Sequence, residues 1–260
     1  MSRMGKVARS LLSLRAMRSA RAMPTSRVLV LGVFLLDKAN VAPEIVMRLQ
    51  SRRHQVDHRW ACVGKGDSRK DEMRAHIALE FDSPVPKFTI INRLLSKIDL
   101  RAYDYVIISD DDIELAPGFL DEFLGLQAYC GFSLAQPARS QLSNVDHPVT
   151  LESHARIARQ TRFVEIGPLF SIASAAYPHL LPFDESFYMG WGLDHVWPVT
   201  LERAGLSQGI IDITPLHHRM RPVATTYSGA FAQEQMSASL RGRESIHPLD
   251  RVRPLRTIWW

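Results

Sequence analysis

The sequence predicts an α/β fold: a single domain with a mostly parallel central sheet flanked by helices. Short apolar runs, typical of strands covered on both faces, alternate along the chain with segments of helical periodicity. One such run, 106–108, leads directly into Asp110, Asp111 and Asp112. Open α/β sheets bind their ligands beyond the carboxyl ends of their strands. We therefore expect the functional site beside these three aspartates.

The first part of the chain supplies regular strands and helices. Residues 27–34 form the first apolar strand, and no G-x-G-x-x-G turn follows it, which argues against a dinucleotide-binding domain. The spacing of apolar residues predicts helices at 40–53 and 87–98, and a strand is predicted at 55–63. Residues 71–80 are polar, and we expect them to be irregular or helical.

The alternation continues less regularly after the aspartates. Pro117 favours a helix at 118–129, because proline fits the first helical turn. Residues 139–161 are polar and are predicted to form a loop with weak structure. The remaining predicted elements are strands at 132–136, 163–166 and 209–213, an apolar segment at 169–175, and helices at 177–181 and 195–204. We expect one α/β domain at 27–230 between a basic amino-terminal tail, 1–26, and a basic, aromatic carboxy-terminal tail, 231–260.

Composition limits the class of partner. The net charge of +5 and the pI of about 9.4 favour anionic partners such as nucleotides or an anionic membrane face. The sequence has no zinc-finger spacing and no RNA-binding aromatic motif, so we expect no nucleic-acid partner. Cys62 and Cys130 are the only cysteines and provide neither a disulfide framework nor a zinc site. This favours a reducing compartment and a cytoplasmic location.

Much of the positive charge lies near the amino terminus. Seven basic residues precede the first acidic residue, Asp37: Arg3, Lys6, Arg9, Arg15, Arg18, Arg21 and Arg27. Four explanations stay open for this segment: a helix in peripheral contact with an anionic membrane, an organelle transit peptide, a disordered tail, or an upstream start codon ahead of a true start at Met23. No apolar run approaches the roughly 20 residues that a transmembrane helix needs.

The three aspartates carry the chemistry that we expect. Side chains alternate along a strand, so Asp110 and Asp112 are predicted to share a face. Two such carboxylates repel each other unless a positive group lies between them. Mg²⁺ or Mn²⁺ suits this role, because both prefer oxygen ligands and keep positions open for substrate phosphates. The alternative is an acidic loop that caps the following helix.

A second stretch, 190–194, combines two glycines with an aromatic ring and an acid. The glycines allow a close approach of the backbone to a ligand, and Trp191 offers a stacking surface. Asp194 is a candidate general base, because an apolar wall raises the pKa of a carboxyl group. Alternatively, the stretch is a tight helix-entry turn with Asp194 as the N-cap.

A third stretch, 212–218, ends in His217 and His218. Imidazole can complete a mixed oxygen and nitrogen shell around a metal. Because the pair follows a predicted strand downstream of the aspartates, we expect one histidine to be a ligand; the alternative is a structural role.

Together these stretches resemble the GT-A glycosyltransferases. More closely, the chain is similar to a family known only as a domain of unknown function, common in plants and bacteria. The matching stretches follow the same order along the chain: 87–92, 103–112, 133–138, 163–171, 191–194 and 209–218. The resemblance implies a Rossmann-like GT-A catalytic domain at 27–230.

The resemblance also assigns roles to individual residues. It implies that a divalent metal binds Asp110, Asp112 and His218, since His218 has the family's spacing from Asp212. It implies that Asp194, the acidic residue of the Trp-Gly-Leu-Asp turn, is the catalytic residue; this turn is one residue shorter than its galactosyltransferase-like counterpart. The residues implied to lie near the nucleotide-sugar donor are Lys87, Asn92, Asp111 (a Glu in the family pattern), Trp191 and Gly192.

The function implied by the resemblance is that of a metal-dependent glycosyltransferase of the hexosyltransferase class. Mn²⁺ or Mg²⁺ would neutralise the leaving nucleoside diphosphate. Asp194 would take the proton of an acceptor hydroxyl on a carbohydrate or a lipid-linked acceptor, and direct displacement would invert the configuration. Two alternatives stay open: a metal-dependent phosphohydrolase, and a nucleotide- or sugar-binding module without turnover.

Overall fold

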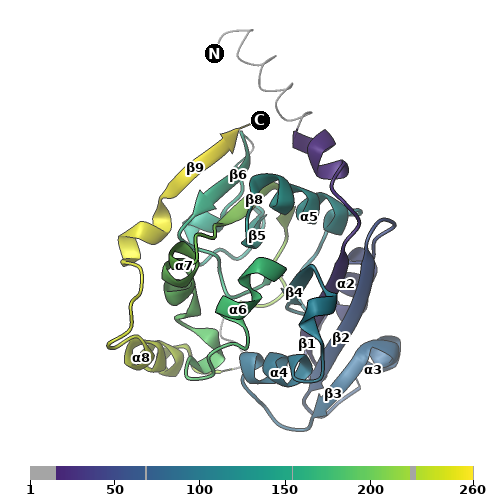
Figure 1. Ribbon diagram of the computed structural model, residues 1–260. Coiled ribbons are helices and arrows are strands. Elements are labelled where there is room, and N and C mark those ends of the chain that lie inside the picture. Colours follow the sequence, from purple (N-terminus) through teal and green to yellow (C-terminus); the bar gives the residue numbers. More distant parts are fainter. Residues whose placement is uncertain (1–15, 68, 154, 223–226, 260) are drawn as a thin grey trace.

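The computed structural model describes residues 16–67, 69–153, 155–222 and 227–259. Within these residues the chain forms one nine-stranded sheet flanked by helices, in the strand order β3-β2-β1-β4-β7-β5-β8-β6-β9 (Figure 1). The predicted α/β fold with a central sheet is confirmed.

The first four strands form a parallel block. They are β1 (Arg27–Leu35), β2 (Gln55–Val63), β3 (Ile77–Phe81) and β4 (Tyr105–Ser109). Strand β1 is central: it pairs in parallel with β2 on one side and with β4 on the other. The sequence of β1 is almost continuously apolar because both of its faces are covered, as in other parallel sheets. The carboxyl ends of β1, β2 and β4 consequently meet at one edge.

The other half of the sheet is mixed. Strand β7 (Leu169–Ala173) is antiparallel to β4 and to β5 (Leu134–Arg139), and β5 is parallel to β8 (Gln208–Leu216). Strand β6 (Arg156–Thr161) is antiparallel to β8 and to the edge strand β9 (Pro254–Trp259). Following these pairings, β6 and β7 run against their neighbours and the other strands share one direction. The sheet is therefore mostly parallel, as predicted.

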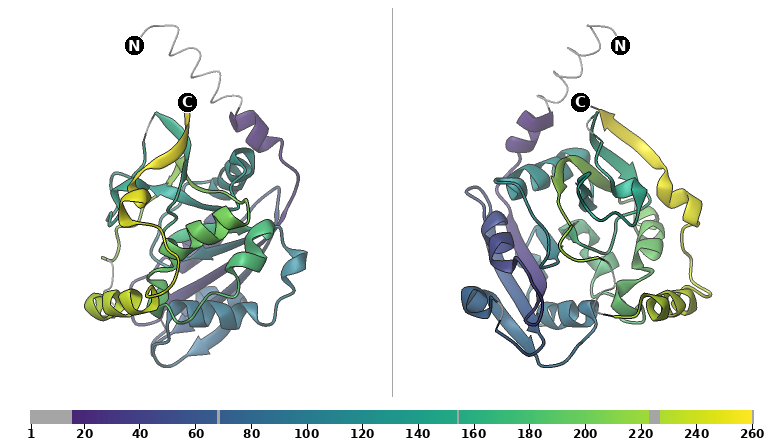
Figure 2. Two further views of the ribbon diagram at one scale, coloured as in Figure 1. Left: turned by 60° about the vertical axis from the view of Figure 1, so that its left-hand side comes forward. Right: turned by 180° about the vertical axis from the view of Figure 1, so that it is seen from behind.

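Helices cover both faces of the sheet (Figure 2). Helices α2 (Ala42–Arg48) and α5 (Phe119–Cys130) pack on one face, and α4 (Lys87–Leu95), α6 (Tyr177–Leu180) and α7 (Leu193–Arg203) pack on the other. Two further helices, α3 (Lys70–Met73) and α8 (Gly229–Ser239), lie at the periphery (Figure 1). Single turns of 3₁₀ helix are η1 (Arg74–His76), η2 (Leu100–Ala102), η3 (Pro148–Thr150), η4 (Ser174–Ala176), η5 (Tyr188–Gly190) and η6 (Pro248–Val252).

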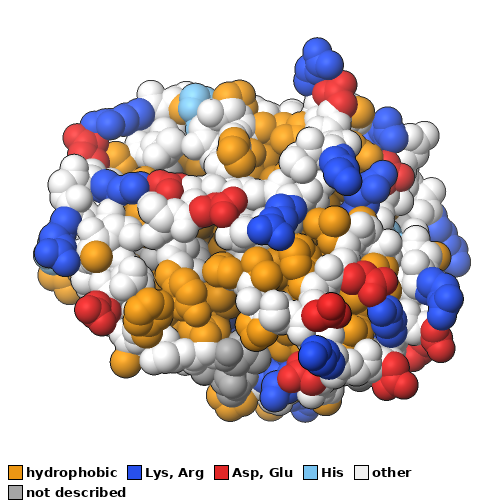
Figure 3. All heavy atoms as spheres, turned by 90° about the horizontal axis from the view of Figure 1, so that it is seen from below, with side chains coloured by type: hydrophobic (Ala, Val, Ile, Leu, Met, Phe, Trp, Pro, Cys, Tyr) orange, Lys and Arg blue, Asp and Glu red, His pale blue; other side chains and the backbone are white. Residues whose placement is uncertain are grey.

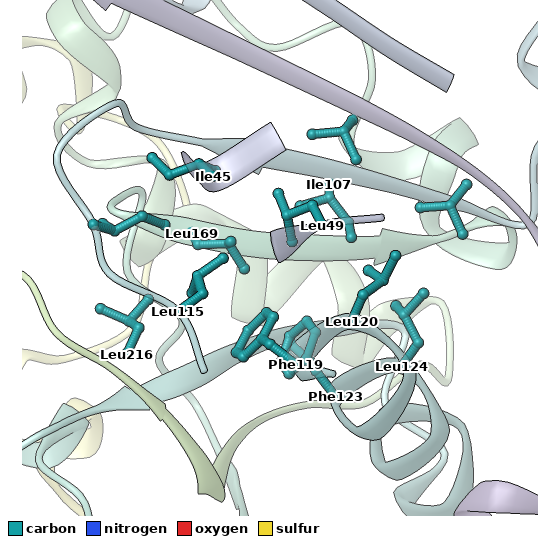
Figure 4. Close-up of a cluster of buried hydrophobic side chains, with 14 of the residues drawn as sticks. Ile45, Leu49, Ile107, Leu115, Phe119, Leu120, Phe123, Leu124, Leu169 and Leu216 are labelled. Atoms are coloured by element: carbon teal, nitrogen blue, oxygen red, sulfur yellow. The ribbon is translucent and has the colours of Figure 1, made fainter. Parts of the chain in front are cut away.

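Two hydrophobic cores follow from the alternation of strand side chains. In β4, Ile107 packs with α2 and α5, whereas Val106 and Ile108 pack with the helices of the opposite face. Figure 4 shows the first core, where Phe119 and Phe123 of α5 lie with Ile107 (Figure 4). Each fully buried side chain of this size contributes about 1.5–3 kcal/mol relative to exposure. The two cores hold the end of β4, and with it the aspartates, between packed layers.

Some elements differ from those predicted. The stretch 163–166 is not a strand, although Phe163 and Val164 are buried. Its backbone bonds to a side chain instead of a neighbouring strand: the N–H of Glu165 donates to Oε1 of Gln136 at 2.5 Å. This run is apolar because it packs in the core, and not because it joins the ladder.

Three strands lie within stretches that were predicted to be irregular, a loop or a tail. Strand β3 begins inside 71–80, and its residues alternate between half-buried and exposed at an edge of the sheet. Strand β6 lies inside the predicted loop 139–161, where the buried Arg159 pairs with Asp212 at 2.8 Å. Strand β9 lies inside 231–260 and is largely exposed. The charged or exposed residues of β6 and β9 give no apolar period to detect, whereas in β3 the apolar Ile77, Leu79 and Phe81 do alternate with exposed positions.

The amino-terminal segment is in part packed. Residues 16–21 are helical, and Ala16 and Ala20 are buried. A Cβ atom at Gly125 of α5 would lie 2.6 Å from the carbonyl oxygen of Ala20, so the glycine permits this close approach. The predictions of a membrane-surface helix or transit peptide rest mainly on residues 1–15, which lie outside the described residues. Among the described helices, none has the length and apolar character to cross a membrane.

Candidate active site

A cavity of about 1110 Å³ lies at the carboxyl ends of β1, β2 and β4, between α4 and α8. Figure 3 looks onto the side where these two helices lie: hydrophobic side chains gather in the middle of the face, with acidic and basic side chains around them (Figure 3). Eight of the predicted site residues line the cavity, namely Lys87, Asp110, Asp111, Asp112, Trp191, Gly192, Asp194 and His218. The structure therefore brings three separate sequence stretches into one site.

Asp110, directly after the carboxyl end of β4, forms an ion pair with Lys87. Lys87, the first residue of α4, donates from Nζ to Oδ1 of Asp110 at 2.5 Å and to the carbonyl oxygen of Ile166 at 3.3 Å. A Cβ atom at position 167 would lie 3.0 Å from Oδ2 of Asp110, so Gly167 leaves room for this carboxylate. Asp110 is thus held by a lysine, apart from the contacts of Asp111 and Asp112.

Asp111 points to the end of β1 and is buried. Its Oδ2 accepts the backbone N–H of Leu35 at 2.9 Å, and its Oδ1 pairs with Arg221. Burial raises the pKa of Asp111 to about 7, and the nearby Arg221 guanidinium opposes part of that rise. Asp111 therefore connects Arg221 of the site to the last residue of β1, Leu35.

Asp112 meets His218 through a backbone contact between two distant segments. The backbone N–H of Glu114 donates to the carbonyl oxygen of His217 at 2.8 Å, and the reciprocal bond is 3.1 Å long. This bridge places Nε2 of His218 3.2 Å from Oδ2 of Asp112. The same oxygen accepts a bond from Nε of Arg221 at 3.1 Å.

The ionisation of Asp112 differs from that of its neighbour. Burial alone would raise the pKa of Asp112, but the hydrogen bonds from His218 and Arg221 outweigh it and lower the pKa to about 2. Asp112 is therefore an anion in the folded protein, and it already has two positive or proton-donating partners.

Arg139 hydrogen-bonds to Nδ1 of His218, the ring nitrogen that does not contact Asp112. It is the last residue of β5, its side chain is almost fully buried, and it donates from Nη1 to Nδ1 of His218 at 2.6 Å. It also forms a two-bond pair with Glu165, at 3.0 Å and 2.5 Å. Because a guanidinium only donates, Nδ1 of His218 accepts, and the ring proton lies on Nε2 towards Asp112.

The residues around Asp112 fit a divalent cation in ligand type and charge. Asp112 offers a hard oxygen ligand, His218 offers an imidazole, and Arg221 demonstrates that this position accepts a positive group. The fit is incomplete in two respects. Asp110 pairs with Lys87 instead of joining them, and within the described part of the chain no group of three or more His, Cys, Asp and Glu side chains converges as metal ligands.

The Gly-Trp-Gly turn holds its shape by packing. Gly190 and Gly192 have φ values of +86° and +104°, and a side chain on Gly190 would overlap the ring of Phe88. Between them, Nε1 of Trp191 donates to the hydroxyl of Tyr227 at 2.9 Å. The N-cap of α7 is Gly192, so Asp194 lies within the first helical turn and is not the cap.

Asp194 lies deep in the cavity wall, with 7% of its surface exposed. Burial raises the pKa of Asp194 to about 7; Arg251 lowers it and Glu165 raises it further. An acid with this pKa exchanges a proton readily near neutral pH, which is what a general base requires.

Two predicted candidates lie outside this arrangement. Asn92 does not line the cavity; its amide donates to the carbonyl oxygen of Phe183 and to Glu185, both at 2.8 Å, and so joins α4 to the loop before η5. His217 places its Nδ1 2.5 Å from Oγ of Ser140, and it does not line the cavity.

Among the lining residues that were not predicted are four charged ones, Arg139, Glu165, Arg221 and Arg251. Glu165 lies in a stretch that carried the resemblance, but the three arginines are single basic residues in polar segments. No spacing distinguishes such arginines from surface ones, so the sequence gives no signal for them.

No protein-family model and no curated protein matches the sequence. The narrower likeness to a domain of unknown function is therefore not confirmed.

Solved structures do match the fold. GalNAc-T7, crystallised with UDP, GalNAc and Mn²⁺, superimposes with a TM-score of 0.55 over 79% of this chain and 45% of its own, at 9% identity. TarS of S. aureus gives 0.52 over 86% of this chain and 41% of its own, at 6% identity. A mycobacterial protein gives 0.51 over 86% of this chain and 76% of its own, at 16% identity.

These likenesses concern architecture. The chain spans less than half the length of GalNAc-T7 and of TarS, and the identities are low. GalNAc-T7 and TarS are GT-A-type glycosyltransferases, and the nine-stranded sheet with its flanking helices has the same overall arrangement. The described chain has a GT-A-like glycosyltransferase fold.

Proposed function

We propose that this protein is a nucleotide-sugar-dependent glycosyltransferase. The observation that carries the proposal is the placement of Asp112 and His218, 3.2 Å apart, in the same cavity as the buried Asp194. Transfer from a nucleotide sugar in this mechanism uses an anionic group that binds a cation and a group that accepts a proton. Asp112 would serve as the first and Asp194 as the second. The GT-A-like fold, and the presence of UDP and Mn²⁺ in the GalNAc-T7 crystals, support the same reading.

The donor would occupy the side of the cavity formed by β1, β2 and α4. Val33, Leu35 and Val63 give this part an apolar lining suited to a nucleoside. Lys87 offers a point charge to a phosphate once it leaves Asp110. Asp112 and His218, with Asp110, would hold Mn²⁺ or Mg²⁺, and the metal would supply neutralisation of charge on the leaving diphosphate.

The acceptor would occupy the other side, near the Gly-Trp-Gly turn. Tyr188 and Trp191 line this part of the cavity with Tyr227, and such rings suit the apolar face of a sugar. In this arrangement Asp194 takes the proton of the attacking hydroxyl. Its raised pKa of about 7 leaves a substantial fraction both ionised and basic at neutral pH. Direct displacement of the diphosphate from the opposite face inverts the anomeric configuration.

Carbohydrate and lipid-linked acceptors are both compatible with this lining. Peripheral contact with an anionic membrane would add access to lipid-linked acceptors, and it rests on the basic residues of 1–26 rather than on the cavity.

The test is an incubation with common nucleotide sugars, Mn²⁺ and a mixture of carbohydrate and lipid-linked acceptors, with products separated by mass. We expect sugar transfer by the unaltered protein and none by Asp112→Asn or Asp194→Asn. Release of free phosphate without transfer would favour a phosphohydrolase instead. Metal-dependent nucleotide binding with neither product would favour a binding module.

A further inference from the structure

The carboxy-terminal segment contributes a charged side chain to the cavity. Pro248 and Arg251, both in η6, line the same space as Asp194. Sequence patterns placed this segment in a tail, yet two contacts anchor it before Arg251, and the pairing of β9 with β6 anchors it after Arg251. The backbone N–H of Ile246 donates to the carbonyl oxygen of His195 at 2.9 Å, and Asp250 pairs with Arg162 at 2.9 Å. The position of Arg251 is thus fixed by the fold.

Arg251 is held by partners that do not neutralise it. Its Nη1 donates to Nε2 of His195 at 2.8 Å, and its guanidinium lies 5.6 Å from the ring centre of Phe163. Within the described part of the chain, no carboxylate lies within salt-bridge distance of Arg251, whereas the cavity-lining Arg139 and Arg221 each have one. Its positive charge therefore acts on whatever anion the cavity presents.

Arg251 lines the same cavity as Asp194 and hydrogen-bonds to the next residue along the chain, His195. The other titratable groups on this side are the exposed Asp146, Glu165 from the loop before β7, and two histidines, His147 and His195. Glu165 is matched by Arg139 in its two-bond pair. Burial lowers the pKa of both histidines, that of His195 to about 4, so they are neutral at pH 7.

We infer that Arg251 is a positioning residue for Asp194: its guanidinium, oriented by His195, favours the charged form of the buried Asp194 carboxylate. In enzymatic terms this rests on the proposed role of Asp194 as the base. The electrostatic coupling between the two residues does not depend on that role and can be measured without any substrate.

The difference between the folded and unfolded pKa values of Asp194 determines how stability changes with pH. The pKa of Asp194 is raised by burial to about 7 in the folded protein, against about 4 in the unfolded chain. Ionisation therefore lowers stability as pH rises from about 4 through 7. Removal of Arg251 would raise the folded pKa further, so the loss of stability would extend to higher pH by about one unit or more.

A double-mutant cycle on stability tests this coupling. Urea unfolding would be followed at pH 5.5 and pH 9 for the unaltered protein, Arg251→Gln, Asp194→Asn and the double variant. We expect Arg251→Gln to lower the urea midpoint more at pH 9 than at pH 5.5, and we expect this pH-dependent difference to vanish in the Asp194→Asn background. Asp111 also has a raised pKa, but its contribution is common to all four proteins and cancels.

Arg253→Gln is the matched control, because Arg253 is exposed and lies two residues away. We expect its effect to be the same at both pH values. Arg251→Lys should restore most of the pH 9 stability, since it keeps the charge. An equal loss at both pH values for Arg251→Gln, or an undiminished pH-dependent loss in the Asp194→Asn background, would overturn the inference and leave Arg251 with a packing role.

A second readout applies if sugar transfer is observed. The acidic limb of the pH–rate profile should move upward by about one unit or more in Arg251→Gln, with Arg251→Lys close to the unaltered protein. A uniform drop at every pH would contradict the inference. If no transfer is found with any donor, the proposed function fails, while the stability cycle still decides the coupling.

Discussion

Arg139 donates a hydrogen bond to Nδ1 of His218 at 2.6 Å, and this bond sets which way the histidine faces the site. With Nδ1 accepting, Nε2 carries the proton and donates to Asp112. For Nε2 to bind a metal through its lone pair, the proton must move to Nδ1 and the N–H of Arg139 must withdraw. The structure thus describes a resting arrangement in which two arginines, Arg139 and Arg221, hold the groups that a metal would use.

Arg221 occupies the charge position that we assign to the divalent ion. It pairs with both Asp111 and Asp112, and its side chain is 17% exposed. We expect Arg221→Ala to bind Mn²⁺ about tenfold more tightly or better, because a competing positive charge a few ångströms away is removed. Calorimetry without nucleotide measures this directly.

The control for that experiment is Arg219→Ala. Arg219 lies in the same segment and pairs with Glu114 at 3.0 Å on the surface, with half of its side chain exposed. Its removal should leave Mn²⁺ affinity unchanged. Weaker Mn²⁺ binding by Arg221→Ala than by the unaltered protein would contradict the idea that the arginine and the metal share one position.

The buried pair of Arg139 and Glu165 should be costly to break from one side. Arg139→Gln leaves the Glu165 carboxylate buried with its charge unmatched, and we expect a loss of about 3–5 kcal/mol in the free energy of unfolding. The double variant with Glu165→Gln should recover part of that loss. Urea unfolding gives both values. Arg101→Gln, which breaks an exposed pair with Asp99, should change stability by less than about 1 kcal/mol.

Gly192 should not tolerate a side chain. Its φ is +104°, and a Cβ atom would lie 2.8 Å from the ring of Phe187. We expect Gly192→Ala to lower stability by about 1–3 kcal/mol and to displace Asp194, two residues on. Gly205→Ala is the matched control: its φ is +69°, but no atom lies within 4 Å of the added Cβ. Equal losses for the two variants in thermal unfolding would show that packing at Gly192 is unimportant.

Transfer activity should rise with pH through about 7. The folded pKa of Asp194 lies at about 7 through burial, so the base is protonated and inactive at pH 5 and ionised at pH 8. The pH–rate profile of kcat/KM should therefore show an acidic limb near pH 7, and Asp194→Asn should lose transfer while it retains donor binding. An activity that stays constant from pH 5 to pH 8 would assign the proton transfer to another group.

Much of this site could be predicted from sequence because it lies at the ends of apolar strands. The run before Asp110 marks β4, and strand geometry then places the aspartates at the sheet edge, beside the end of β1. His218 was predicted because, in the resemblance to the glycosyltransferase-related family, it has the family's spacing from Asp212. Its contact with Asp112, however, depends on the backbone bridge between Glu114 and His217, which joins residues far apart in the chain.

The parts that sequence did not predict depend on tertiary pairing. Arg139, Arg221 and Arg251 are ordinary basic residues until the fold places each beside a specific histidine or carboxylate. Likewise β9 is largely exposed, and its pairing with β6 determines its conformation. Local periodicity carries no information about such partners.

Calorimetric titration of nucleoside diphosphates, with and without Mn²⁺, tests the proposed function most directly. We expect the unaltered protein to bind at least one nucleoside diphosphate in the presence of Mn²⁺ and to lose most of that affinity when the metal is removed. Asp112→Asn should bind weakly under both conditions. Binding that is indifferent to Mn²⁺ and unchanged in Asp112→Asn, or no binding of any nucleoside diphosphate, would contradict the assignment of this site to nucleotide-sugar chemistry.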